Sequence, residues 1–223
     1  MKYKMTPKEY FRKIIELYEI SRVPQFYNPN IQRGRSASIS SGLEDLTALF
    51  IALNNPKQCQ YFTDQPMKFK GTTTKYPDIV IQNQNGMIEH LIDVKTDTGW
   101  NRNGTYDFCE KWEKTIAKAK GTKTSFMRGL DKVLIKGDFS SDLKYHVVVI
   151  SKRNSGKNIE VDRARVTENL HNVCLYILSD GIHPNKYGLS AEIKLAAIKI
   201  ANAEVEKLLS TITNRKWDGA GAG

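Results

Sequence analysis

Residues 76–95 read YPDIVIQNQNGMIEHLIDVK and contain two β-rich runs, DIVIQ (78–82) and MIEHLIDVK (87–95). Asn85-Gly86 lies between them, and both residue types tolerate the positive φ that the tight turn of a hairpin requires. The stretch therefore predicts two antiparallel strands joined by a short turn.

Helices and further strands are predicted on both sides of this hairpin. Thr6-Pro7-Lys8-Glu9 has the residues of a capping box and opens the first helix. Apolar residues at helical spacing predict further helices at about 41–54, 107–120, 161–170 and 190–211. Strands are expected within 60–69, and at 145–151 and 173–178, where nearly continuous apolar runs indicate burial on both faces. We therefore expect an α/β fold with a mixed central β-sheet flanked by helices.

Length and composition indicate one domain of 223 residues, with residues 1–218 folded and 219–223 (GAGAG) forming a flexible tail. Lys and Arg number 34 against 24 Asp and Glu, a net charge of +10. That excess favours a polyanionic partner, because neutralising phosphates releases condensed counterions. A basic surface kept for solubility is the alternative explanation.

Several classes are disfavoured. No run of 18 apolar residues is present, so we expect no membrane span. No Gly-rich phosphate loop occurs, so ATP is not expected as a partner. The N-terminus lacks an apolar secretion signal, and the cysteines (Cys59, Cys109 and Cys174) match no disulfide or zinc spacing. We expect a reducing, intracellular setting.

The hairpin also carries a cluster of charged residues. Asp93 and Lys95 are two residues apart, so both project from one face of their strand, while Ile88, Ile92 and Val94 are expected on the other. An antiparallel partner strand can return Asp78 to their neighbourhood. Two carboxylates can hold Mg²⁺, which activates water and neutralises phosphate charge, and the Lys95 ammonium can orient that water or stabilise the attacked phosphate.

Pro77-Asp78 followed by Asp93-Val94-Lys95 resembles the PD-(D/E)xK motif of the nuclease superfamily that includes type II restriction endonucleases. The resemblance covers about 20 residues directly and implies a restriction-endonuclease-like core. It implies Asp78 and Asp93 as metal ligands, the Val94 carbonyl as a further ligand, and Lys95 as the catalytic lysine.

Many members of that superfamily also place a glutamate on the helix before the hairpin, where Glu44 stands in this chain. Two explanations of Glu44 remain open, because Ser41-x-x-Glu44 is itself a capping box that needs no metal. Asp45 is the neighbouring candidate if the register differs by one residue.

The resemblance implies a Mg²⁺-dependent endonuclease, foremost a type II restriction endonuclease of the prokaryotic cytoplasm, cutting double-stranded DNA to leave 5′-phosphate and 3′-hydroxyl ends. Cutting both strands with one site per chain suggests a homodimer. The alternatives are a repair, recombination or mobile-element nuclease of the same fold, and a basic nucleic-acid-binding protein without catalysis.

Three segments are rich in groups that bind DNA: the region around 33–35, the loop at 96–105 and the loop at 151–157. Their side chains can donate to phosphates, read base edges or stack. An ordinary turn or a solvated basic loop is the alternative explanation of each segment. The candidate DNA contacts are Arg33, Arg35, Thr98, Trp100, Asn101, Arg102, Asn103, Lys152 and Arg153.

Overall fold

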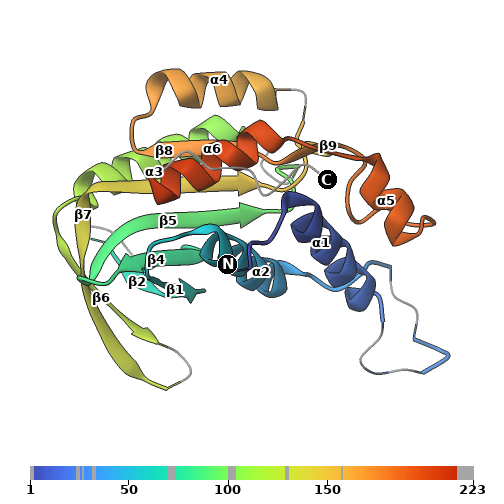
Figure 1. Ribbon diagram of the computed structural model, residues 1–223, viewed down its shortest axis with the longest axis horizontal. Coiled ribbons are helices and arrows are strands. Elements are labelled where there is room, and N and C mark those ends of the chain that lie inside the picture. The colour runs from blue at the N-terminus through green and yellow to red at the C-terminus, as the bar shows by residue number, and fades with distance from the viewer. Residues whose placement is uncertain are drawn as a thin grey trace.

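The predicted hairpin lies in the middle of a six-stranded sheet in the computed structural model of the chain (Figure 1). Strands β4 (Ile79–Asn83) and β5 (Met87–Lys95) are antiparallel, with Ile79 opposite Ile92. Of the turn residues only Gly86 has a positive φ, +80°, while the Asn83 side chain accepts the backbone N–H groups of Asn85 and Met87. The turn thus needs a positive φ at Gly86 but not at Asn85.

The structure describes residues 3–23, 26, 28–31, 34–69, 74–99, 104–128, 131–156 and 158–214. The predictions made for Arg33, Trp100, Asn101, Arg102, Asn103 and the tail at 219–223 lie outside these ranges.

The sheet is mixed, as predicted. Its order is β1-β4-β5-β7-β6, and β8 pairs with the second half of the long strand β7. β1, β4 and β5 are antiparallel neighbours, whereas β5, β7 and β8 run parallel. The remaining large-sheet strands are β1 (Cys59–Thr63), β6 (Lys123–Arg128), β7 (Val133–Val149) and β8 (Val173–Ile177). Two small pairs join β2 (Met67–Lys68) to β3 (Thr74–Lys75) and β9 (Ser179–Gly181) to β10 (Ile198–Ile200).

Helices cover both faces of the sheet and divide the core in two (Figure 1). One face packs against α1 (Pro7–Ser21), α2 (Ser40–Asn54) and α6 (Asn202–Thr213). The other packs against α3 (Thr105–Ala119) and α4 (Ile159–Asn169). The α/β prediction is therefore confirmed. None of the helices in the described ranges is long and apolar enough to cross a bilayer.

The prediction of one long helix over 190–211 was wrong. The segment divides into α5 (Ala191–Ala197), strand β10 and α6. Ile198 to Ile200 pair with Gly181 to Ser179 of β9, and the Ala201 N–H donates to the Leu178 carbonyl at 2.8 Å. Strand partners distant in sequence therefore override the local helical spacing.

The expected grouping of Ile88 with Ile92 and Val94 was also wrong. Ile88 packs on the α3 face, whereas Ile92 and Val94 pack on the α1 and α2 face. The register of β5 shifts between Ile88 and His90 in its pairing with β7, and an extra residue in a strand reverses the alternation of side chains.

Strand β6 and the first part of β7 were not predicted. They form a two-stranded ribbon, with Lys123 opposite Asp138 at its base and Arg128 opposite Val133 toward its tip. In Figure 1 the ribbon projects below the sheet at the left, while the connection from α1 to α2 projects below it at the right.

Candidate active site

Asp78 lies immediately before β4, and it bonds to the end of β5. Pairing of β4 with β5 ends at Ile79 opposite Ile92, so the Val94 N–H farther along β5 has no strand partner there. The Asp78 Oδ2 atom accepts that N–H at 2.6 Å. The carboxylate is thus fixed on the strand that carries Asp93 and Lys95, as the sequence predicted.

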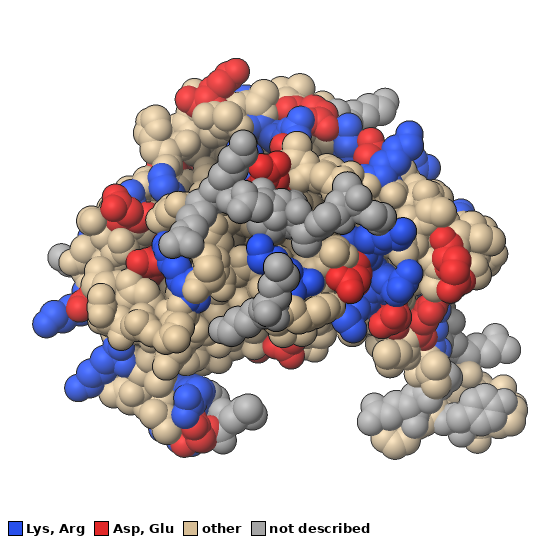
Figure 2. Space-filling view, in the orientation of Figure 1, with Lys and Arg blue, Asp and Glu red and all other residues tan. Residues whose placement is uncertain are grey.

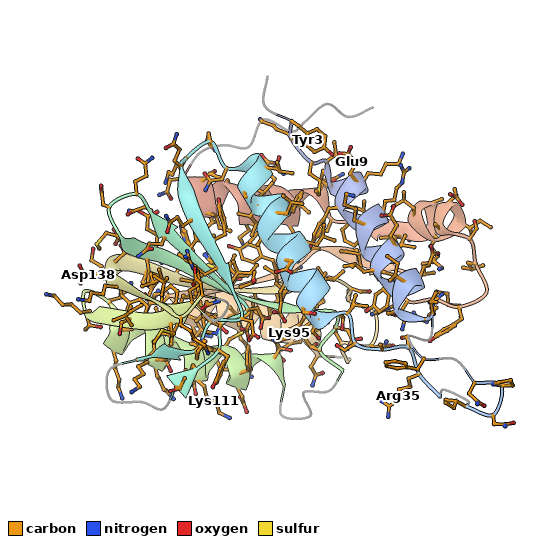
Figure 3. The ribbon with its side chains drawn as sticks, turned by 90° about the horizontal axis from the view of Figure 1, so that it is seen from below. Tyr3, Glu9, Arg35, Lys95, Lys111 and Asp138 are labelled. Atoms are coloured by element: carbon orange, nitrogen blue, oxygen red, sulfur yellow. The ribbon has the colours of Figure 1, made fainter. Side chains whose placement is uncertain are left out.

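Lys95 lies between the two carboxylates. Its Nζ atom is 3.3 Å from Asp78 Oδ2 and 3.2 Å from Asp93 Oδ2. The side chains of Asp78, Asp93 and Lys95 are 16%, 8% and 22% exposed, so the cluster is partly shielded yet reachable. Seen from below, Lys95 lies beside α2, near the middle of the molecule (Figure 3).

The electrostatics of this cluster favour an added cation. Burial raises the pKa of Asp78, and the neighbouring Asp93 carboxylate raises it further, against the opposing effects of Lys95 and the Val94 N–H. Burial acts to lower the pKa of Lys95, but the two carboxylates together outweigh it, so its pKa is raised and the ammonium persists. Two carboxylates with one ammonium leave a net negative site.

Glu44 belongs to the same electrostatic environment. Burial raises its pKa to about 7, with the Asp78 and Asp64 carboxylates adding to the shift. The expected capping box is absent, because α2 begins at Ser40 and its N-cap residue, Ile39, makes no side-chain cap bond. The capping-box explanation of Glu44 is therefore wrong. The alternative, Asp45, is exposed and accepts the Thr63 hydroxyl at 2.9 Å.

The protein oxygens of the cluster can hold Mg²⁺ only if oxygens of the substrate and of water complete its coordination. Within the described ranges no group of three or more His, Cys, Asp or Glu side chains is arranged to hold a metal ion. Mg²⁺ is commonly held by one or two carboxylates plus phosphate and water oxygens, and Asp78 and Asp93 supply two carboxylates. The Val94 carbonyl lies on the same strand edge as its N–H, which faces Asp78.

Two residues near the cluster escaped the sequence analysis. Tyr145 of β7, which lies opposite Leu91, is fully buried and stacks on Trp112, and its hydroxyl makes no hydrogen bond of normal geometry with any described residue. Burial and the Asp93 carboxylate raise the pKa of this phenol. The Asp64 N–H donates to the Asp78 carbonyl at 3.0 Å. In the sequence, only the turn-forming pair Gln65-Pro66 marks the position of Asp64. Tyr145 has the sequence pattern of an ordinary core residue.

The predicted DNA contacts within the described ranges differ in availability. Thr98 is 4% exposed and its hydroxyl donates to the Ser155 carbonyl, so it joins two loops instead of facing DNA. The Lys152 ammonium lies 2.7 Å from the Glu160 carboxylate, so its charge is already paired. Arg35 and Arg153 are exposed.

No model of a known protein family matches this chain, and no curated protein matches its sequence. The geometry of the cluster defines a partly buried site of two carboxylates and one ammonium at the end of a β-hairpin.

Proposed function

We propose that the chain is a Mg²⁺-dependent DNA endonuclease with a restriction-endonuclease-like core. The observation that carries the proposal is the position of the Lys95 ammonium, 3.3 and 3.2 Å from the Asp78 and Asp93 carboxylates. An acid pair beside a lysine at the open end of a hairpin suits phosphodiester hydrolysis. A basic binding surface alone does not require such an arrangement.

Asp78, Asp93 and the Val94 carbonyl would hold the metal. Bound Mg²⁺ would activate a water molecule and neutralise charge on the phosphate. Lys95 would donate a hydrogen bond to the attacking water or to a non-bridging phosphate oxygen, where negative charge grows in the transition state. Glu44, with a pKa of about 7, is suited to accept the proton that the water loses.

The proposed reaction is in-line attack of water on phosphorus. A phosphorus–oxygen bond to the water oxygen forms, the bond from phosphorus to O3′ breaks, and O3′ leaves with a proton from solvent. The products carry 5′-phosphate and 3′-hydroxyl ends.

The shape of the molecule supports DNA as the substrate. Figure 2 shows a hollow on the underside between the two projections, with Lys and Arg side chains along the left-hand one. Seen from below, Lys95 lies between Asp138, at the base of the β6–β7 ribbon, and Arg35, on the α1–α2 connection (Figure 3). Together with the net charge of +10, this arrangement suits a duplex held across the site.

Plasmid cleavage by the wild type and by Asp93→Asn, with Mg²⁺ or with EDTA, tests the proposal. Discrete fragments that require Mg²⁺ and vanish in Asp93→Asn support a type II restriction endonuclease, which we expect to act as a homodimer on double-stranded DNA in a prokaryotic cytoplasm. Preferential cutting of branched DNA points instead to a repair, recombination or mobile-element nuclease. DNA binding without cleavage under any condition overturns the enzymatic proposal.

A further inference from the structure

A polar pocket of about 590 Å³ is lined in part by the residues that follow Lys95 in the chain. It is formed at the carboxyl ends of the parallel strands β5 and β7, where Thr96 and Asp97 follow Lys95 directly and Arg153 and Asn154 follow β7. The segment after β9, with His183, Lys186 and Tyr187, closes another side. The open edge at the carboxyl ends of parallel strands is a common place for ligands in α/β sheets.

The loops that form this pocket are bonded to one another. The Ser151 N–H donates to the Thr96 carbonyl at 3.0 Å, and Thr98 bonds Ser155 through both its N–H and its hydroxyl. A Cβ atom on Gly99 would lie 2.4 Å from the Asn154 carbonyl oxygen, so this close approach requires glycine. The pocket is therefore held in shape without a ligand, which reduces the entropic cost of binding.

Two residues that line the pocket, Asp97 and Tyr187, offer groups suited to a nucleobase. The Asp97 carboxylate accepts the Gly99 N–H at 3.0 Å and lies 3.4 Å from His183 Nε2; His183 is the main cause of its lowered pKa, which keeps it an acceptor. Tyr187 is 56% exposed, and the Arg22 guanidinium lies 4.1 Å from its ring centre. A carboxylate and an aromatic ring are the groups that read the edge of a base and stack on its face.

The rim of the pocket offers cations for a phosphate. Arg153 and Lys186 are both exposed, and neither forms an ion pair with any other described residue. Lys152, their neighbour in the sequence and the fold, is by contrast committed to Glu160. The Arg153 and Lys186 cations suit the phosphate of a nucleotide. The Asp97 carboxylate and the Tyr187 ring suit its base.

We propose that this pocket binds one nucleotide of the DNA strand next to the scissile phosphate, with Arg153 and Lys186 on its phosphate and Asp97 and Tyr187 on its base. The inference rests on the proposed nuclease function. Asp97 is two residues from Lys95, so their Cα atoms are at most about 7 Å apart, and a nucleotide in the pocket is close in the strand to the phosphate at Lys95. The volume suits a single nucleotide and is too small for a duplex.

Binding of mononucleotides to the wild-type protein in EDTA tests the pocket without metal or cleavage. We would titrate dAMP, dGMP, dCMP, TMP and inorganic phosphate and follow backbone amide shifts by ¹⁵N NMR. We expect at least one nucleotide to shift the amides of Asp97, Asn154 and Lys186 more strongly than phosphate does. Arg153→Ala and Tyr187→Ala should each raise the Kd about tenfold. Lys118→Ala, an exposed lysine on α3 that does not line the pocket, is the matched control and should leave the Kd unchanged.

The inference is overturned if no nucleotide shifts these amides. It is also overturned if nucleotide and phosphate cause identical shifts, because the pocket is then only an anion site. Adding duplex DNA distinguishes the source of the nucleotide. Displacement of the mononucleotide by DNA supports a nucleotide of the strand, whereas simultaneous binding of both points to a free nucleotide and refutes the inference.

Failure of the pocket and failure of the nuclease proposal are separable. If the protein cleaves DNA but binds no mononucleotide, only the inference about the pocket fails. Nucleotide binding without cleavage removes the nuclease proposal while leaving a nucleotide site in place.

Discussion

Replacing Asp78 by asparagine should stabilise the metal-free protein at pH 8. The asparagine side-chain oxygen can still accept the Val94 N–H, which Asp78 Oδ2 accepts at 2.6 Å, and Lys95 keeps Asp93 at 3.2 Å. The substitution removes one of two carboxylates that share a partly buried site. Two carboxylates held close together in a partly buried site disfavour the folded state when no added cation neutralises them.

The magnitude follows from the pKa of Asp78, which burial and Asp93 raise from 3.8 to about 6. A difference of about two pKa units corresponds to at most about 3 kcal/mol of unfavourable free energy for the ionised form in the folded protein. Solvent relaxation reduces this, so we expect a gain of about 1–2 kcal/mol and a rise in Tm of about 3–6 °C.

The stability gained by the Asp78→Asn variant should depend on pH. Below pH 3.8 the Asp78 carboxyl is protonated in both the folded and the unfolded wild type, so the variant gains nothing. The wild type loses stability relative to the variant as pH rises from 3.8 to about 6, and the full difference is present above about 6.

Urea unfolding in EDTA at pH 4 and pH 8, and again with Mg²⁺ at pH 8, measures these effects. Mg²⁺ should stabilise the wild type by RT ln(1 + [Mg²⁺]/Kd) and should have little effect on the variant. Asp142→Asn, at an exposed position on β7, is the matched control and should change stability by less than about 0.5 kcal/mol. A variant less stable than the wild type at pH 8 in EDTA would refute the reasoning, because the attraction between Asp78 and Lys95 would then exceed the crowding of the carboxylates.

Three further predictions concern the site and its substrate. Glu44→Gln should lower the rate of cleavage about 10²- to 10⁴-fold with DNA affinity unchanged, and an unaltered rate in single-turnover assays would exclude Glu44 as proton acceptor. Mg²⁺ should bind more weakly at pH 5.5 than at pH 8, because Asp78, a proposed ligand with a pKa of about 6, must lose its proton, and Glu44 nearby, with a pKa of about 7, adds negative charge only when ionised. Calorimetry at pH 5.5 in buffers of different ionisation enthalpy should detect proton release, and its absence contradicts the prediction. Replacing Lys123, Lys132 and Lys136 of the β6–β7 ribbon by alanine should weaken DNA binding and reduce the slope of log K against log salt by up to about 3, whereas an unchanged slope places the DNA elsewhere.

Local patterns were sufficient for the centre of the fold and for the principal cluster. The Thr6–Glu9 capping box, the strands on either side of Gly86 and the shared face of Asp93 and Lys95 depend on neighbours a few residues away. Such interactions are set by backbone geometry and survive in any fold that keeps the hairpin.

The tertiary structure excluded the capping-box explanation of Glu44, while its catalytic role stays a proposal. Its raised pKa depends on burial and on Asp78, which follows it by 34 positions in the sequence, whereas the capping box depended on where α2 begins. The start of a helix shifts by one residue at small energetic cost, so the local pattern at Ser41 could not settle the role of Glu44.

The sequence by itself determined the α/β class, the hairpin and the pairing of Asp93 with Lys95, because each follows from short-range periodicity. Only the tertiary structure decided that β6 and β7 form a ribbon and that strand β10 (Ile198–Ile200) interrupts the last helix. It also decided that Ile88 packs on the opposite face of the sheet from Ile92. It also brought together the loops after β5, β7 and β9 into one pocket. These features depend on strand partners and loop contacts distant in the chain, whose free energy of pairing overrides local preference and leaves no local pattern to read.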